Sequence, residues 1–443
     1  MPNLAVRGTV RSTMTPPIPK AQAWIRQFPA TASRPLLNLS QGVPGEAPEK
    51  IFTDRISELS QDREPANYGS IQGDDGLREA VKEEMGDVYR WNEKGSGGVG
   101  VVKEQIAISA GCNQAFYLTM SVLCSEGDEV LIPCPWYFNM LMTFQLLRLK
   151  PVPLPLSPSN GFTPSVDQAK SLITPRTRAI ALVSPNNPCG TIYPPALLDS
   201  FCGLAKESGI ALVVDETYRD FVPPSPSRAP GAGDRGKPHD LFDEPDWDET
   251  LVSLFSFSKS YKIPGYRLGG IVASRTVLEA CRTVADCIQA SLRKKNGICP
   301  ARLPQLALAE LLPALRPSLI STSKALASRL KRFEDAISIV PGWQVVSSGG
   351  YFSYVKFPDV YGPDVTSERV AERLAIECGV LTLPGCWFMP EREDEGWKSL
   401  ERMGSELISD RWLRFAIANV SDETVDKIPE RLKQLNELYA AGS

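Results

Sequence analysis

The segment SFSKSYKIPGYRLGG, residues 256–270, combines two lysines, an arginine and several serines directly after an apolar run. The preceding residues 251–255 (LVSLF) have the composition of a buried β-strand. A buried strand does not normally end in such a polar cluster unless an anionic or reactive group lies there. Lys259 could attack a carbonyl carbon, and Arg267 could bind an anion.

The acid Asp215 ends a second apolar run, LVVD (212–215). A carboxylate at the buried end of a strand is costly unless a cation or a hydrogen-bond donor faces it. Tyr218 follows three residues later, in the segment DETY. The pattern therefore predicts a positively charged partner for Asp215.

Two further strand ends carry groups that suit ligand binding. Asn186 and Asn187 follow the apolar run 179–183 and are held between prolines, although an Asx turn is the simpler explanation of this pair taken alone. The turn SAG (109–111) precedes a helix that is expected to begin near Cys112. Free N–H groups at the start of a helix bind phosphate, but one such turn is a weak signal by itself.

One molecule satisfies these groups together. A phosphate would pair with Arg267 and with the hydroxyl groups of Ser256 and Ser258. Asp215 needs a cation, and Lys259 needs an electrophile. Pyridoxal 5′-phosphate offers a phosphate, a protonatable pyridine nitrogen and an aldehyde. The polar strand ends therefore predict a site for this cofactor.

The polar groups are carried by short β-rich runs that alternate with helix-like segments. This alternation predicts an α/β fold with a mostly parallel sheet between helices, in which ligands bind at the carboxyl ends of the strands. Later β-rich runs predict a smaller α/β domain. The expected strands of the large sheet are residues 106–109, 129–132, 179–183, 210–214, 251–255 and 270–273, and those of the smaller domain are 344–346, 351–355 and 412–417.

The length of 443 residues exceeds what one hydrophobic core usually holds, so two domains are expected. We assign residues 1–60 to an N-terminal arm and part of the small domain, 61–325 to a large cofactor-binding domain, and 326–443 to a small C-terminal domain. The boundary follows Pro313 and Pro317, where a helix-like segment carries the chain onward.

Composition and charge disfavour several classes of function. The net charge of −4 and the ordinary apolar content indicate neither a nucleic-acid nor a membrane partner. The single histidine, His239, lies in a segment expected to be a loop, which disfavours Ser-His-Asp and Cys-His mechanisms and metal sites built on several histidines. The ten cysteines are scattered along the chain, as in a reduced cytoplasmic protein.

Two segments interrupt the regular pattern. The first 45 residues carry basic but no acidic side chains, which is compatible with a mitochondrial transit peptide. Pro16, Pro17 and Pro19 favour an extended arm instead, because proline interrupts an amphipathic helix. The stretch 221–250 is rich in Pro, Gly and Asp, and we expect a surface insertion there rather than a cover over the site.

The motifs SAGCNQA, PCPWYFN, PNNPCG, DETY, SFSKSYKIPGYRLGG and WLRFAIANV occur in this order along the chain. In this set and order the sequence resembles the class I/II aminotransferases, which are pyridoxal-phosphate enzymes of fold type I. The resemblance extends from Asn38 to Val420. It implies transfer of an amino group between an amino acid and a 2-oxo acid, and a homodimer with shared active sites.

Carried over by position, the resemblance implies a role for each polar strand end. Lys259 would form the aldimine with the cofactor and move the proton from the substrate Cα. Asp215 would pair with the pyridine nitrogen. Asn187 and Tyr218 would hydrogen-bond the 3′ oxygen of the ring, and Tyr137 would stack on its face.

The resemblance also implies how phosphate and substrate are held. Arg414 would bind the substrate α-carboxylate, assisted by Asn187 and the backbone near Gly42. Lys262 lacks an arginine at the offset typical of the family and is expected at the surface. The residues expected around the phosphate are Cys112, Asn113, Ser256, Ser258 and Arg267, with Tyr68 reaching it from the partner subunit.

Other outcomes stay open on the sequence. The same site could run an elimination, of the type catalysed by 1-aminocyclopropane-1-carboxylate synthases or C–S lyases, although the former carry a glutamate in an LAEN-like segment where this chain has LSQG (39–42). A regulatory protein that only senses the cofactor is less favoured. Such proteins normally carry an added DNA-binding region, and the short N-terminal segment is not expected to hold one. The amino donor is undetermined. Arg293 lies near the position where enzymes of dicarboxylic amino acids place a partner arginine, but a solvated charged turn explains it better.

Overall fold

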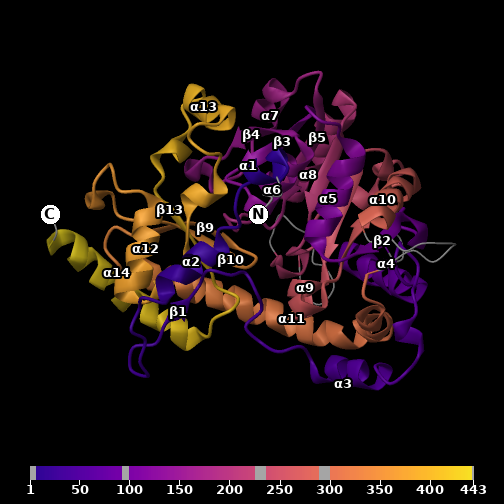
Figure 1. Ribbon diagram of the computed structural model, residues 1–443, viewed down its shortest axis with the longest axis horizontal. Helices are drawn as coiled ribbons and strands as arrows, with labels where there is room; N and C mark the ends of the chain where they lie inside the picture. Colours follow the sequence, from indigo (N-terminus) through magenta and orange to yellow (C-terminus); the bar gives the residue numbers. More distant parts are fainter. Residues whose placement is uncertain (1–5, 92–98, 225–235, 289–299, 442–443) are drawn as a thin grey trace, which may run out of the picture.

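The computed structural model describes residues 6–91, 99–224, 236–288 and 300–441 of the chain. Figure 1 shows a larger part around a seven-stranded sheet and a smaller part around a four-stranded sheet, with one long helix running along both. The predicted fold class, a mostly parallel sheet between helices followed by a smaller α/β part, is confirmed. None of the described helices is long and apolar enough to cross a membrane.

The strands of the large sheet lie in the order β2-β8-β7-β6-β5-β3-β4. Neighbouring strands run parallel except at β8, which is antiparallel to both β2 and β7. All six expected strands of this sheet are present. The sequence does not predict β4, because its three prolines argue against a strand; at the edge of the sheet, beside β3, they are tolerated. The strands are β2 (Ile106–Ser109), β3 (Glu129–Cys134), β4 (Lys150–Pro155), β5 (Thr177–Val183), β6 (Ala211–Asp215), β7 (Leu251–Ser256) and β8 (Gly269–Val272).

The inner strands of the large sheet carry apolar side chains on both faces, so helices cover both faces of the sheet. In β5, Ile180 and Leu182 pack into one hydrophobic core with α4 and α8. Ala181 and Val183 of the same strand pack into a second core with α5, α6 and α10. This explains why these strands read as continuous apolar runs rather than alternating patterns. The helices are α4 (Asp75–Tyr89), α5 (Cys112–Leu123), α6 (Phe138–Leu147), α7 (Val166–Leu172), α8 (Pro195–Ser208) and α10 (Arg275–Ile288).

The smaller part is an antiparallel sheet in the order β12-β13-β10-β9, covered by helices. The expected strands of this part are present. A two-stranded pair of β1 (Leu37–Asn38) with β11 (Val380–Leu381) attaches the N-terminal segment to it. The other elements are β9 (Gln344–Gly349), β10 (Phe352–Lys356), β12 (Leu383–Pro384), β13 (Trp412–Ala416), α12 (Ser367–Cys378), α13 (Glu395–Arg402) and α14 (Asp422–Ala441).

The long helix α11 (Arg302–Ser338) connects the two parts and runs across the lower half of the view in Figure 1. It packs against α3 (Lys50–Leu59) and α4 of the larger part and against α14 of the smaller part. Leu308 and Leu312 are buried in the larger part, whereas Leu326 and Phe333 are buried in the smaller part. The boundary assigned at residue 325 falls inside this helix, and the division into domains stays a prediction.

The expectation of an extended N-terminal arm is wrong for the described residues. The segment contains two short helices, α1 (Gly8–Ser12) and α2 (Ile18–Ile25). Pro17 is the N-cap of α2 and Pro19 lies in its first turn, where the missing N–H of proline has no helical partner to lose. Trp24 of α2 is buried and stacks on Trp387 at a centroid distance of 5.3 Å, which fixes this helix on the smaller part.

The expectation of a surface insertion at 221–250 is wrong for the part of it that the structure describes. Leu241, Phe242 and Trp247 are buried in a hydrophobic core of the larger part. The ring of Phe242 makes edge contacts with Tyr89 and Trp247. Short single-turn 3₁₀ segments bring these apolar side chains inward despite the polar composition around them.

Candidate active site

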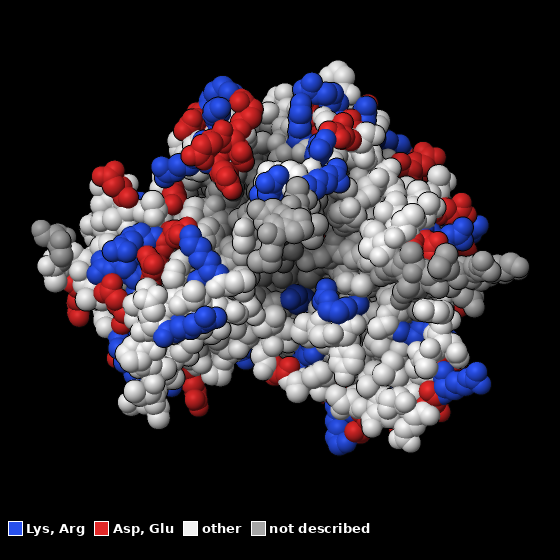
Figure 2. Space-filling model, viewed as in Figure 1, with Lys and Arg blue, Asp and Glu red and all other residues white. Residues whose placement is uncertain are grey.

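A cavity of about 270 Å³ lies at the carboxyl ends of the central strands, between the two parts of the molecule. Figure 2 shows the molecule hollowed at its centre, with Lys and Arg atoms visible in the hollow. The described residues of the 221–250 stretch do not line the cavity. The predicted site residues that do line it are Gly42, Cys112, Asn113, Tyr137, Asn187, Asp215, Tyr218, Ser256, Ser258, Lys259, Arg267 and Arg414.

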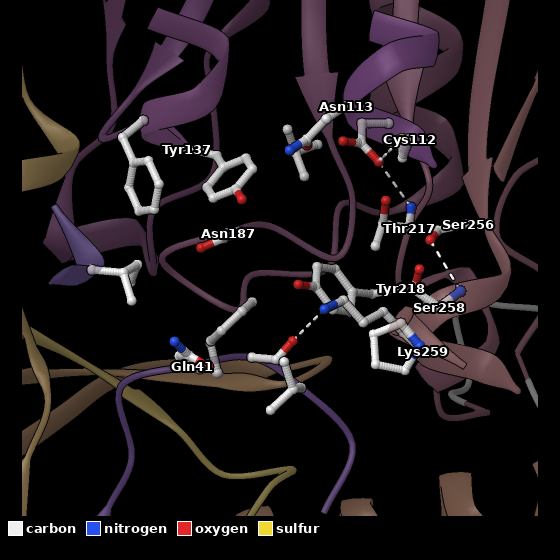
Figure 3. A pocket seen from close by; sticks show the side chains of 18 of the residues that line it. Gln41, Cys112, Asn113, Tyr137, Asn187, Thr217, Tyr218, Ser256, Ser258 and Lys259 are labelled. Carbon is white, nitrogen blue, oxygen red and sulfur yellow. Dashed lines mark hydrogen bonds between the residues drawn. The ribbon is translucent and has the colours of Figure 1, made fainter. Parts of the chain in front are cut away.

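Lys259 projects into this cavity from α9 (Phe257–Ser260), the short helix that follows β7. Its Nζ donates a hydrogen bond to the carbonyl oxygen of Gly42 (Figure 3). The helix is anchored on both sides of the lysine, because Tyr351 Oη donates to the Lys259 carbonyl at 3.0 Å and Ser260 Oγ donates to Asp220 Oδ2 at 2.5 Å. These bonds hold the backbone that carries the lysine.

The surroundings of Lys259 favour its neutral form. Burial, and then the positive charges of Arg414 and Arg267, lower the pKa of the Lys259 amine to about 8. An ordinary lysine has a pKa of about 10.4. The amine is therefore available as a nucleophile near neutral pH, which an exposed lysine is not.

Asp215 stands at the end of β6, with its side chain 9% exposed. Its Oδ1 accepts a hydrogen bond from the Thr217 N–H at 2.9 Å and faces Cys112 Sγ at 3.4 Å. Burial raises the pKa of the Asp215 carboxyl, and no lysine or arginine among the described residues forms an ion pair with it. The carboxylate therefore has room for a cationic partner in the cavity.

Hydrogen-bond donors that could hold an anion line the cavity near Cys112, at the start of α5. The helix α5 begins there after Gly111, which has no side chain that could cap the first helical N–H groups. A Cβ on Gly111 would lie 2.4 Å from Arg267 Nη2, so glycine is required for the arginine to approach the helix. Ser256 and Ser258 line the cavity beside Arg267, and the Ser258 N–H donates to Ser256 Oγ at 3.2 Å. Together these donors suit an anion with several oxygens, such as phosphate.

Arg414 lines the cavity from β13 of the smaller part and is 3% exposed. Its Nη1 donates to Asn187 Oδ1 at 2.9 Å, and its Nη2 donates to the Ser40 carbonyl. The guanidinium lies 4.6 Å from the centroid of the Phe352 ring. Burial lowers the pKa of Arg414 to about 10, so the side chain still carries its charge at neutral pH. Within the described part of the chain its buried Nε has no hydrogen-bond partner.

Two tyrosines, Tyr137 and Tyr218, also line the cavity (Figure 3). Tyr137 precedes α6, and Tyr218 packs edge-on against Phe352 at a centroid distance of 5.3 Å. Burial raises the pKa of both hydroxyl groups, so both are neutral at physiological pH and can donate hydrogen bonds.

Several residues of the cavity are not anticipated from the sequence. Thr217 holds Asp215 and could have been suspected from its place in the DETY segment. Gln41 and Val43 flank the predicted Gly42. Ile18, Phe138 and Phe352 come from α2, α6 and β10 and carry no local signal; they line the cavity together with Val183 and Pro264.

Three further sequence-based expectations concern Tyr68, Arg293 and Lys262; the first two stay predictions, and the third is wrong. Tyr68 is 59% exposed and does not line the cavity of its own chain. Arg293 lies outside the described residues. Lys262 is not a surface residue: its side chain is 7% exposed, and its Nζ pairs with Glu46 at 2.5 Å and Glu49 at 3.1 Å. The backbone at Lys262 is left-handed, with a φ of 60°, and turns the chain after α9. The Lys262 side chain is thereby directed toward Glu46 and Glu49.

The acid next to Asp215, Glu216, lies in a buried cluster outside the cavity. Tyr89 Oη donates to Glu216 Oε1 at 2.6 Å, Ser253 donates to Oε2, and His239 Nε2 lies 3.2 Å from Oε1. Burial alone would raise the pKa of Glu216, but His239 and Arg219 bring it below its ordinary value. The only histidine of the chain therefore supports the strand that carries Asp215 and is not placed to act on a ligand in the cavity.

Comparison with known proteins identifies the family. Residues 34–432 match the family Aminotransferase class I and II. The aromatic aminotransferase ISS1 of Arabidopsis thaliana is 27% identical over 368 residues, which cover 82% of this chain and 85% of that protein. The arginine–pyruvate transaminase AruH of Pseudomonas aeruginosa is 27% identical over 382 residues, which cover 84% of this chain and 88% of that protein. The aspartate aminotransferase of Rhizobium meliloti shares the fold, with a TM-score of 0.80 at 20% identity over 98% of this chain and 99% of that chain.

The chain belongs to the class I and II aminotransferases, a family that depends on pyridoxal phosphate. The prediction of an aminotransferase, made from the resemblance in motifs and their order, is confirmed. The relatives are named for aromatic, arginine and aspartate substrates, so their names do not select one donor for this chain.

Proposed function

We propose that this chain binds pyridoxal 5′-phosphate in the cavity at Lys259 and with it transfers an amino group from an amino acid to a 2-oxo acid. The observation that carries the proposal is Asp215. It is a buried carboxylate without a cationic partner among the described residues, and it lines the same cavity as a low-pKa lysine and a cradle for phosphate. The cofactor would satisfy all three features.

The residues present fit this group. Arg267, Ser256, Ser258 and the start of α5 at Cys112 and Asn113 would hold the phosphate. Asp215 would hold the protonated pyridine nitrogen. The positive charge of this nitrogen would lower the pKa of the Asp215 carboxyl, which burial raises. Asn187 and Tyr218 would donate to the ring oxygen, and Tyr137 would cover one ring face. Bound there, pyridoxal phosphate supplies an electron-poor ring that stabilises negative charge on the substrate Cα.

The side chains of the cavity would then do three things. Lys259 would anchor the cofactor through Nζ and later carry the proton to and from the substrate Cα; a pKa of about 8 lets both forms of the amine be populated near neutral pH. Arg414 would bind the substrate α-carboxylate with Asn187 already aligned beside it at 2.9 Å. The aromatic walls would exclude water around this ion pair, which strengthens it.

We also propose a homodimer in which Tyr68 of one subunit reaches the phosphate of the other. The exposure of Tyr68, outside the cavity of its own chain, supports this arrangement. The cytoplasmic location stays a prediction from the cysteine pattern.

Transamination is tested with the two half-reactions. Protein loaded with pyridoxal phosphate and mixed with an amino donor should convert the absorbance of the aldehyde form of the cofactor to that of the amine form. Addition of a 2-oxo acid should restore the first spectrum and produce the corresponding amino acid. Release of ammonia and a thiol from a cysteine conjugate without an acceptor would instead indicate a β-elimination. Turnover of S-adenosylmethionine would indicate an elimination of the 1-aminocyclopropane-1-carboxylate synthase type, and an unchanged spectrum with every donor would indicate a non-catalytic binding protein.

The pKa of Lys259 predicts how the cofactor-free protein takes up the cofactor. Only the neutral amine attacks an aldehyde, so the rate of covalent attachment should rise with pH and level off above a midpoint near pH 8. Stopped-flow absorbance between pH 6 and 10 measures this rate, with N-acetyl-lysine as the reference amine. A midpoint for the protein as high as that of the reference would show that the cavity does not lower the pKa.

A further inference from the structure

We propose that Tyr351 is a positioning residue for amino transfer, which fixes Lys259 relative to Arg414 from outside the cavity. This inference rests on the proposed function and adds a residue to it. It follows from the hydrogen bond of the Tyr351 hydroxyl group, from the rings that this side chain contacts, and from the turn that carries it.

Lys259 and Arg414 come from different parts of the molecule. Lys259 lies on α9, after β7 of the large sheet, whereas Arg414 lies on β13 of the smaller part. Under the proposed function, Arg414 determines where the substrate Cα lies, and Lys259 must reach the proton on that atom. A displacement of about 1 Å between such groups can lower a rate by about 10²-fold. A direct link between the two parts at this point therefore matters for the rate.

Tyr351 provides such a link. Its Oη donates a hydrogen bond to the Lys259 carbonyl oxygen at 3.0 Å. Its backbone is tied to the end of β13, because the Tyr351 carbonyl oxygen accepts a hydrogen bond from the Ile417 N–H at 2.9 Å. Tyr351 is 2% exposed, and burial raises the pKa of its hydroxyl group, which therefore stays protonated and can donate. One residue thus connects the strand of Arg414 with the backbone of Lys259.

The ring of Tyr351 supports a second residue of the cavity. Its centroid lies 5.1 Å from that of Tyr218 and 4.8 Å from that of Phe221. Tyr218 lines the cavity, but Tyr351 is not among the described residues that line it. Tyr351 therefore contacts Lys259 and Tyr218 from outside the cavity, and it would act on a ligand only through them.

The turn between β9 and β10 brings Tyr351 to this place. Gly350 in this turn has a φ of 52°, and a Cβ on it would lie 2.9 Å from Pro185 Cβ of the larger part. Glycine therefore lets the turn approach the larger part closely. Ser347 Oγ of β9 donates to the Cys189 carbonyl at 2.6 Å and holds the turn on the loop that follows β5. The link at Tyr351 is thus part of a packed contact between the two parts.

The first test is the half-reaction of the loaded enzyme with its fastest amino donor, unlabelled and deuterated at Cα. Tyr351→Phe keeps the ring and removes the hydroxyl group. The single-turnover rate constant at saturating donor should fall by about tenfold, and half-saturation should change by less than about twofold, because Arg414 is untouched. The deuterium isotope effect should be retained or increased, because the slowed step is proton transfer by Lys259. An unchanged rate constant or a smaller isotope effect would overturn the proposal.

Covalent attachment of pyridoxal phosphate to the cofactor-free protein gives a readout that does not depend on turnover. Tyr351→Phe should lower the attachment rate reached at high pH by about threefold or more, because the backbone that carries the attacking amine is held less well. The midpoint should stay near pH 8, since burial and the charges of Arg414 and Arg267 are unchanged. An unchanged rate, or a shifted midpoint in its place, would contradict the positioning of Lys259.

Tyr361→Phe is the matched control. Tyr361 is a buried tyrosine of the smaller part whose Oη donates to Asn436 Oδ1 at 2.5 Å, and it does not line the described cavity. Its replacement should lower the melting temperature to a similar extent but change neither rate. Equal losses of both rates in the two variants would show that Tyr351 has a structural role only. Failure of every donor with the unchanged enzyme would overturn the proposed function itself, and the attachment kinetics would still decide on the link to Lys259.

Discussion

Lys259→Ala removes covalent attachment of pyridoxal phosphate and lowers the rate of amino transfer by about 10⁴-fold or more. The expected loss is this large because one amino group both anchors the cofactor and carries the proton of the substrate Cα. Among the described residues that line the cavity we expect no replacement base, since the tyrosine hydroxyl groups stay protonated and Asp215 is assigned to the ring nitrogen; Lys262 is engaged with Glu46 and Glu49. Mass spectrometry after borohydride reduction measures attachment, and single-turnover absorbance measures the rate.

The neighbouring lysine provides the control. Lys262→Met removes the ion pairs between a buried lysine and two exposed glutamates and is expected to lower thermal stability modestly, but it leaves the attachment site intact. A reduced cofactor found on Lys262, or an active Lys259→Ala enzyme, would contradict the assignment. Lys259→Arg should behave like the alanine variant, because a guanidinium keeps the charge but does not form the covalent bond.

The second large effect is expected for Arg414→Lys. A lysine retains the positive charge but loses the two-nitrogen fork that holds Asn187 and the Ser40 carbonyl and would bind a carboxylate. The KM for the amino donor and for the 2-oxo acid should each rise by roughly 10²- to 10³-fold, since a buried charge-assisted pair is lost. Cofactor attachment should persist, because Lys259, Asp215 and the phosphate cradle are unchanged.

Arg411→Lys is the matched control for this variant. Arg411 precedes Arg414 by three residues but donates to backbone carbonyls of Gly362 and Val365, and it does not line the cavity. Its replacement is expected to reduce stability without raising either KM. An Arg414→Lys enzyme with both KM values unchanged would show that the substrate carboxylate binds elsewhere.

Most of the polar half of this site could be predicted because parallel strands bring their carboxyl ends to one edge. Asp215 directly follows an apolar run, and Asn187 and Lys259 follow theirs after a few residues, so local sequence marks both the strand and its end. The apolar half could not be predicted in the same way. Ile18 and Phe352 lie far apart in the chain, on elements whose packing brings them together, and isolated apolar residues resemble any other core residue.

The errors also have physical causes. Prolines suggested an extended N-terminal arm, but the first turn of α2 accepts them. Polar composition suggested a surface insertion at 221–250, yet a few apolar residues among the polar ones suffice to bury the described part. Lys262 looked free because its partners, Glu46 and Glu49, lie more than two hundred residues away in sequence.

The helix α11 has a consequence for how such chains can change over time. Its 37 residues span about 55 Å at 1.5 Å per residue, and its apolar side chains complete the cores at both ends. A recombination event near residue 325 would join two half-helices. It would yield a folded protein only if the rotational phase of the apolar stripe were kept across the junction. Exchange of the C-terminal part between relatives is therefore limited to crossovers that preserve this helical register.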